Sequence, residues 1–271
     1  MKNLIAGLVA LLAVNSWALE IRDPWQQGAT IRGKVEPGSQ VEFLGREVRV
    51  AKGGEFVVGL GRDFPAKAEL TVTGKDGKRK LHTFAVAPRE YNIQKITGVP
   101  QATVTPSPEQ VERSRREAAL VSAARQKDLA TPWFTSDFRW PLVGRISGVY
   151  GSQRVYNGKP GSPHYGIDIA APTGTRVVAP AAGEVTLVHP DMFFSGGTLI
   201  IDHGHGLSST FIHLHKILVK EGDSITKGQE IAEVGATGRA TGPHLDWRIN
   251  WFDQRLDPSL VVGPMPSAAG N

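Results

Sequence analysis

The sequence predicts a mainly β protein. We expect a small N-terminal β-sandwich-like module, a connecting helix and a C-terminal antiparallel β domain. Short runs of alternating apolar and polar residues, separated by turns with Gly or Pro, occur in both halves of the chain. The stretch between them is charged and rich in alanine. We therefore predict a β module at residues 19–97, a linker with one helix at 98–139 and a β domain at 140–262.

The N-terminus has the features of a secretory signal peptide. Lys2 precedes an apolar run that is shorter than the roughly 20 residues needed to span a bilayer. Small residues at Ser16 and Ala18 favour cleavage after Ala18, which makes residues 1–18 the signal peptide. We expect an exported protein of the periplasm or cell envelope, with no stable membrane insertion after cleavage.

Composition narrows the class of protein further. The chain has 271 residues, no cysteine and 40% hydrophobic residues, so two modest domains must be stabilised by burial without disulfides or a lipidation cysteine. Its 31 basic and 26 acidic residues give a net charge of +5, which favours anionic wall polymers only weakly. Basic clusters with interleaved aromatic residues are absent from the sequence, and we expect no nucleic-acid partner.

The N-terminal module contains five runs with the alternation of a half-buried strand. Turn sequences such as Pro37-Gly38 and Gly53-Gly54 separate them. A single histidine, His82, suits a structural role better than a ligand role. The runs are residues 29–33, 40–44, 47–50, 55–59 and 68–72.

The linker contains the start signal of a helix. Ser107 and Gln110 have the spacing of a capping box, and Pro108 stands at the first helical position. We predict a helix that ends near Ala130. Its charged surface is either a solvated face or a cover that lies against a neighbouring active site.

The C-terminal domain contains further strand patterns and most of the histidines. The strand patterns lie at residues 175–179, 183–188, 197–202 and 209–213, and the tail at 263–271 is predicted to be disordered. Side chains an even number of positions apart in a strand share a face. Three pairs have this spacing: His164 with Asp168, His213 with His215, and His244 with Asp246.

Imidazole and carboxylate groups are the ligands that Zn2+ takes in hydrolytic sites, where three protein groups leave the fourth position for water. Each pair alone has a structural explanation. Together with the surrounding glycine-rich segments, they indicate a metal-assisted hydrolase.

The order of these segments resembles that of the lysostaphin-like, LytM-type zinc metalloendopeptidases, which are peptidoglycan hydrolases. The resemblance covers about residues 140–262 and has specific motifs. They lie at residues 147–151, 164–172, 183–185, 201–204, 213–214, 222–225, 227–229, 235–238 and 241–245.

The resemblance implies that His164 and Asp168 are zinc ligands and that His213 and His244 assist catalysis. Asp246 stands where the family has the third histidine ligand. A carboxylate also binds Zn2+, at about 2.0–2.2 Å, so Asp246 is predicted to take that role.

Three further residues are candidates for the site. His215 is a less favoured substitute ligand. Arg154 and Asn157, in the glycine-rich segment before His164, bind substrate in one interpretation and belong to a solvated loop in the other.

The resemblance thus implies a zinc-dependent endopeptidase that cuts peptide bonds in peptidoglycan stems or cross-links, with a metal-activated water and two assisting histidines. The alternative is a catalytically degenerate LytM-like domain that regulates a cell-wall amidase, which would then be its partner. Asp246 is the feature that keeps this alternative open.

Overall fold

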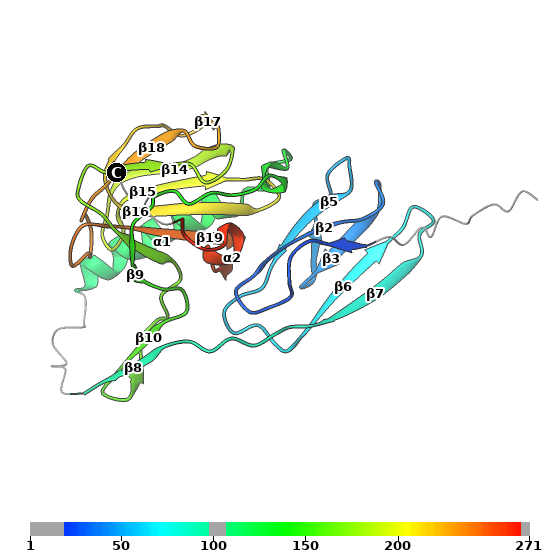
Figure 1. Cartoon of the computed structure of the whole chain (residues 1–271), viewed down its shortest axis with the longest axis horizontal. Helices are drawn as coiled ribbons and strands as arrows, with labels where there is room; N and C mark the ends of the chain where they lie inside the picture. Colours follow the sequence, from blue (N-terminus) through cyan, green and yellow to red (C-terminus); the bar gives the residue numbers. More distant parts are fainter. Residues whose placement is uncertain (1–18, 98–106, 267–271) are drawn as a thin grey trace, which may run out of the picture.

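The structure, a computed structural model, describes residues 19–97 and 107–266. The predicted signal peptide and most of the predicted disordered tail lie outside these residues. The prediction of a mainly β fold with antiparallel sheets is confirmed (Figure 1). In the described ranges, no helix combines the length and apolar character that a membrane span requires.

The N-terminal strands form two small sheets. One has the order β1-β2-β5 and the other the order β4-β3-β6-β7. In β3 and β6 exposed and buried residues alternate, as the sequence pattern predicts. The bounds are β1 (Glu20–Ile21), β2 (Thr30–Lys34), β3 (Gln40–Phe43), β4 (Arg46–Val48), β5 (Glu55–Gly59), β6 (Lys67–Thr73) and β7 (Arg79–Ala85).

The C-terminal domain is built on a ten-stranded sheet with the main order β17-β14-β15-β16-β19-β12-β9, while β13 pairs with β18 and β20 pairs with β19. The central strands β16 and β19 carry the candidate site. The bounds are β9 (Arg145–Gly148), β12 (Ile167–Ala170), β13 (Arg176–Val178), β14 (Gly183–Met192), β15 (Gly196–Asp202), β16 (Leu207–Ile217), β17 (Ser224–Ile225), β18 (Glu230–Val234), β19 (His244–Trp251) and β20 (Gln254–Leu256).

A fourth, small sheet links the two halves of the chain. Strand β8 (Ile93–Ile96) pairs in parallel with β10 (Gln153–Tyr156), and β10 forms a hairpin with β11 (Lys159–Pro160). Figure 1 shows β8 and β10 projecting away from the central sheet.

The central sheet has one apolar face and one partly polar face. Phe211, Trp247 and Ile249 are fully buried on the apolar face. The intervening residues of β16 and β19 point to the opposite face, where Thr210 pairs with Arg248 and Ile212 pairs with Asp246. The strand period therefore separates the packed core from the side chains available for chemistry.

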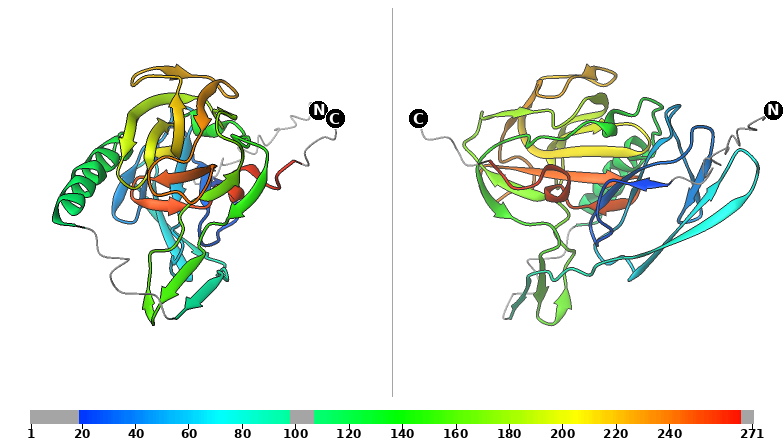
Figure 2. Two further views of the ribbon diagram at one scale, coloured as in Figure 1. Left: turned by 90° about the vertical axis from the view of Figure 1, so that its left-hand side faces the viewer. Right: turned by 45° about the vertical axis from the view of Figure 1, so that its right-hand side comes forward.

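Helix α1 (Pro108–Arg125) covers part of this polar face (Figure 2). The predicted capping box is present, since Ser107 and Gln110 make the reciprocal hydrogen bonds at the helix start. The helix ends at Arg125, before the predicted end near Ala130. Val121 and Ala124 pack against Leu187, Met192 and Ile200. The short helices η2 (Trp133–Thr135) and α2 (Ser259–Val262) follow later in the chain.

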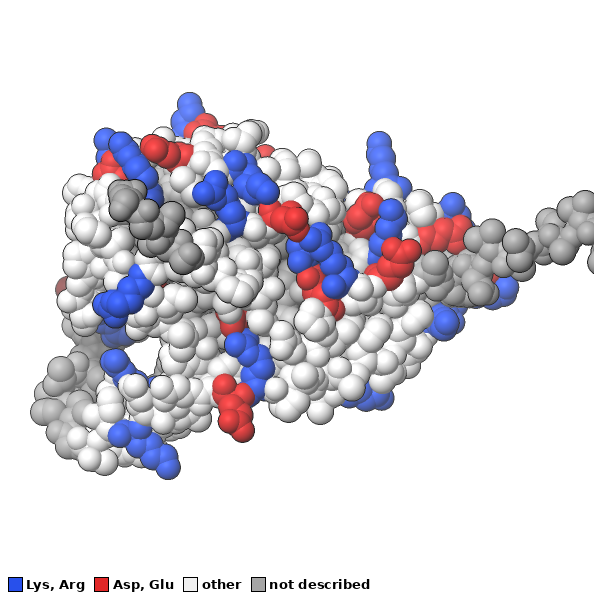
Figure 3. All heavy atoms as spheres, viewed as in Figure 1, with Lys and Arg blue, Asp and Glu red and all other residues white. Residues whose placement is uncertain are grey.

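The two halves share a packed interface. The ring centroids of Phe43 and Trp251 lie 5.9 Å apart. Arg89 of the N-terminal half forms an ion pair of 2.8 Å with the buried Asp257. On the face shown in Figure 3, basic and acidic side chains are interspersed, as expected from the small net charge.

Asp202, at the end of β15, is a fully buried carboxyl group. Its Oδ1 accepts a hydrogen bond of 2.6 Å from the backbone N–H of Gly204. Its Oδ2 has no hydrogen-bond partner within the described residues. Burial is the main cause that raises the pKa of Asp202 to about 7.

We predict a pH-dependent gain in stability for Asp202→Asn. The folded-state pKa lies above that of an unfolded aspartate, so the stabilising contribution of Asp202 is full below about pH 4 and is lost as pH rises to about 7. The amide side chain of the Asp202→Asn variant does not ionise. The variant should gain up to about 4 kcal/mol relative to the wild-type protein across this interval. Urea unfolding of both proteins tests this, and a difference that is constant with pH would contradict it.

Candidate metal centre and adjoining cavity

His164 is held by the loop that precedes β12. Its backbone N–H donates to the carbonyl of Ser152 (2.8 Å), and its carbonyl accepts from the N–H of Gly151 (2.7 Å). Its Nδ1 lies 3.2 Å from the carbonyl oxygen of Val149, which can only accept, so Nδ1 is the donor. These contacts direct Nε2 towards Asp168 and Asp246.

Asp168 and Asp246 face each other across two paired strands, β12 and β19. His164 Nε2 lies 3.1 Å from Asp168 Oδ1 and 3.4 Å from Asp246 Oδ2. Three ligands at 2.0–2.2 Å in a tetrahedral site stand about 3.3–3.6 Å apart, so this spacing is close to that of a metal site. Asp168 Oδ1 is buried and accepts no hydrogen bond within the described chain. The three side chains could therefore hold a metal ion.

The electrostatics of this group favour a bound cation. Burial lowers the pKa of His164, but the carboxylates of Asp168 and Asp246 outweigh it and raise the pKa to about 10. Burial raises the pKa of Asp246, but Arg248 and His164 outweigh it and hold that pKa well below its usual range. The raised pKa of His164 reflects the negative potential of the two carboxylates, whereas the lowered pKa of Asp246 reflects the positive charges of Arg248 and His164.

Arg248 binds Asp246 through two hydrogen bonds. Its Nε donates to Oδ1 (2.9 Å) and its Nη2 donates to Oδ2 (2.6 Å). The residues are two positions apart in β19 and therefore lie on the same face. Sequence reasoning did not assign Arg248 to the site, although this spacing was visible in the sequence.

His213 and His244 lie beside the three residues, with ring centroids 4.7 Å apart. The Nδ1 of His213 contacts the carbonyl of Thr237 and the Nδ1 of His244 contacts that of Gly242, each at 2.8 Å. Since a carbonyl only accepts, each Nδ1 carries the proton in the neutral ring and each Nε2 is left to accept. Burial lowers the pKa of His213, which favours its neutral form.

The predicted shared face of His213 and His215 is wrong. His213 is buried, whereas His215 is exposed and does not belong to the metal-binding group. His213 has a φ of 64°, and the pairing between β15 and β16 shifts register at this point. A bulge of this kind interrupts the strand period on which the prediction depended.

Arg154 and Asn157 lie on the β10–β11 hairpin. Arg154 is exposed and pairs through the backbone with β8, and the backbone N–H of Asn157 donates to the carbonyl of Ile96. Neither residue lines the cavity beside the metal group. Their role in binding substrate stays a prediction.

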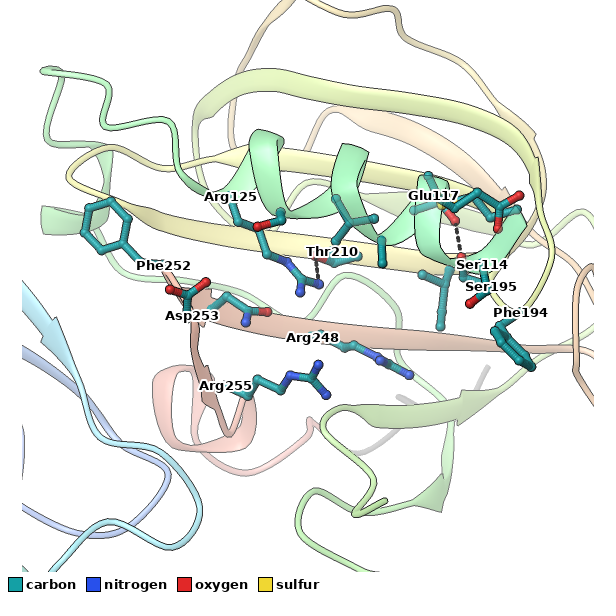
Figure 4. Close-up of a pocket in the computed structure, with 17 residues that line it drawn as sticks. Ser114, Glu117, Arg125, Phe194, Ser195, Thr210, Arg248, Phe252, Asp253 and Arg255 are labelled. Carbon is teal, nitrogen blue, oxygen red and sulfur yellow. Dashed lines mark hydrogen bonds between the residues drawn. The ribbon is translucent and has the colours of Figure 1, made fainter. Parts of the chain in front are cut away.

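The residues His164, Asp168 and Asp246 are called the metal group. A cavity of about 500 Å³ adjoins the metal group on the polar face of the sheet. Strands β16 and β19 form its floor and helix α1 its wall (Figure 4). Ile212 and Arg248 line this cavity. His213 follows Ile212 in the sequence, and Asp246 pairs with Ile212 across the strands. Both His213 and Asp246 belong to the candidate metal centre. The helix therefore contributes to the surroundings of the site.

Three converging donors with two adjacent histidines are the arrangement expected of a metal-dependent hydrolase. A family model, "Peptidase family M23", matches residues 162–258. A crystal structure from Pseudomonas aeruginosa named for peptidase M23 is 31% identical with a TM-score of 0.68, and the match covers 89% of this chain and 96% of that one. The chain belongs to peptidase family M23, a metallopeptidase family.

Two curated relatives extend the comparison. "Peptidoglycan DD-endopeptidase ShyB" of Vibrio cholerae is 44% identical over 51% of this chain and 28% of its own length. An "Uncharacterized metalloprotease" of Haemophilus influenzae is 28% identical over 81% of this chain and 41% of its own length. The chain spans less than half the length of each.

We predict that the ion pair between Arg248 and Asp246 stabilises the metal-free protein. Arg248→Met leaves a buried carboxylate with one fewer partner, which should lower the free energy of unfolding by about 2 kcal/mol or more. Arg248→Met combined with Asp246→Asn should recover part of this loss, because the buried charge is then absent. Urea unfolding with a chelator present measures both effects. Equal stability of Arg248→Met and the wild-type protein would contradict the prediction.

Proposed function

We propose that this protein is a zinc-dependent endopeptidase that hydrolyses peptide bonds in peptidoglycan stems or cross-links. The observation that carries the proposal is the metal-like spacing of His164, Asp168 and Asp246, with the buried Oδ1 of Asp168 accepting no hydrogen bond from the described residues. Membership of a metallopeptidase family supports the reaction class. The names of the Vibrio cholerae relatives support peptidoglycan as the substrate.

In this proposal His164, Asp168 and Asp246 hold the zinc ion. A bound zinc ion supplies a Lewis acid for the scissile carbonyl and lowers the pKa of a coordinated water to about 7. His213 and His244 keep their Nε2 atoms as acceptors, and beside this centre they would accept a proton from water and stabilise charge on the carbonyl oxygen. Their backbone hydrogen bonds hold both rings in the required tautomer.

Arg248 compensates for the carboxylate that replaces a histidine ligand. Two carboxylates, a neutral histidine and the paired arginine carry the same formal charge as one carboxylate and two neutral histidines. The extra negative charge of Asp246 is thereby offset within 2.6 Å. This balance supports a working metal site, since an uncompensated carboxylate would reduce the polarising power of the ion.

The alternative function is regulation of a cell-wall amidase by a domain that has lost catalysis. The observation that favours it is Asp246 at a position where the family has histidine. A metal-free, inactive protein is the result that this alternative requires. Either function would be performed in the periplasm or cell envelope, in line with the peptidoglycan-acting relatives and a relative named as a lipoprotein.

We predict that the wild-type protein binds about one zinc ion per chain and releases peptides from purified peptidoglycan. Asp246→Ala should weaken zinc binding by about 100-fold or more and abolish release, because one of three ligands is removed. The control is Asp76→Ala, which changes an exposed aspartate of the N-terminal module. Metal analysis and chromatography of released peptides measure the outcome. A wild-type protein with neither zinc nor activity would overturn the proposal.

We predict a different phenotype for the two assisting histidines. His213→Gln and His244→Gln should retain about one zinc ion per chain but slow peptide release by about 100-fold to 10,000-fold, because proton transfer and charge stabilisation are impaired. Loss of zinc from either variant would instead identify that histidine as a ligand.

A further inference from the structure

The cavity beside the metal group contains three arginine side chains. Arg125 reaches it from helix α1, Arg248 from β19 and Arg255 from β20, and all three face the same hollow (Figure 4). Thr210 links two of them, since its hydroxyl accepts from Arg125 Nη2 (3.1 Å) and its backbone pairs with Arg248. The positive charges therefore converge on the sheet face that also carries the metal group.

Arg125 has a buried donor without an acceptor. Its Nε is buried and makes no hydrogen bond within the described residues. Burial, with the nearby charges of Arg248 and Arg255, lowers the pKa of Arg125 to about 9. A buried guanidinium N–H that lacks an acceptor costs free energy unless a ligand supplies one. Arg125 therefore points to an anionic ligand.

The acidic side chains of the cavity are engaged elsewhere. Glu117 accepts from Arg113 (2.7 Å) and from the backbone N–H of Phe193 (2.8 Å). Asp253 accepts from Gln126 (2.9 Å). The guanidinium of Arg255 lies over the ring of Tyr165, 4.3 Å from its centroid. Arg248 is paired with Asp246, whereas neither Arg125 nor Arg255 forms an ion pair with a carboxylate within the described residues.

The form of the cavity indicates the chemical class of the ligand. The planar guanidinium group presents a fork of donors that matches a carboxylate. Apolar side chains line the same space, among them Val121, Met192 and Ile212. A short aliphatic peptide segment that carries a carboxylate fits both features. Peptidoglycan stem peptides, whether cross-linked or not, carry both aliphatic side chains and carboxylates.

We propose that this cavity is a subsite that binds a carboxylate of the peptide substrate and that helix α1 completes it through Arg125. The inference rests on the proposed function, because the peptide is the one cut at the metal group. In this inference helix α1 binds substrate directly. The sequence alone suggested either a solvated helix face or a cover that lies against a neighbouring active site. Arg125 lies outside residues 162–258, the part that matches the family model.

The test measures peptide binding without turnover. The probes are a cross-linked stem-peptide dimer with free carboxylates and the same dimer with every carboxylate amidated. Calorimetric titration of the full chain, with a chelator present to prevent cleavage, gives the Kd of each. The wild-type protein should bind the free acid at least about 10-fold more tightly than the amide. Equal affinity for the two dimers would overturn the proposal.

Two variants of Arg125 and one control assign the effect to the cavity. Arg125→Gln should weaken binding of the free acid by about 10-fold or more and leave the amide unchanged. Arg125→Lys keeps the charge but loses the fork, so its affinity should be intermediate. Arg116→Gln, on the exposed side of the same helix, should bind like the wild-type protein. Equal weakening of both dimers by Arg125→Gln or Arg125→Lys would show a structural effect and overturn the proposal.

Failure of this inference is distinguishable from failure of the proposed function. If the protein prefers the free acid through Arg125 but shows no zinc-dependent cleavage, the subsite inference holds and the proposed enzymatic function is wrong. If the protein cleaves peptidoglycan but binds both dimers equally, the proposed enzymatic function holds and the subsite inference is wrong.

Discussion

The antiparallel pairing of β12 with β19 is the constraint on which the metal group depends. It sets Asp168 directly opposite Asp246. The same register pairs Ile169 with Leu245, and both are fully buried. A slip of either strand by one residue would expose its apolar side chain and turn its carboxylate into the core. Hydrophobic burial on one face therefore fixes the position of charged groups on the other.

The buried carboxylate of Asp246 and the partly buried carboxylate of Asp168 require compensating charge at this point. His164 contacts both of them, and Arg248 binds Asp246 with two hydrogen bonds. Because Arg248 lies in the same strand as Asp246, it can orient the carboxylate without contribution from a loop. Orientation of a ligand by a neighbouring group is a general means of tuning metal affinity. In this protein the neighbouring group is a cation that also offsets the negative charge of Asp246.

Helix α1 joins this sheet by a small apolar contact and several polar ones. Val121 and Ala124 provide the apolar contact. Arg113 contacts Asp191 near the end of β14, and Glu117 contacts Phe193 just after that strand. Arg125 contacts Thr210 of β16. The helix is therefore held mainly by side chains whose partners lie far away in sequence. Its position places a guanidinium group from outside the family domain at the edge of the metal group.

The sequence by itself determined the mainly β class, the capping box at Ser107 and the shared face of His244 and Asp246, because each depends on local periodicity or short-range hydrogen bonds. It also supplied the residue types of a metal site. Only the tertiary structure decided that His213 and His215 separate at a bulge and that Arg125 meets Thr210, 85 positions away. Contacts across such distances are set by strand register and packing of the whole sheet, which no local pattern encodes.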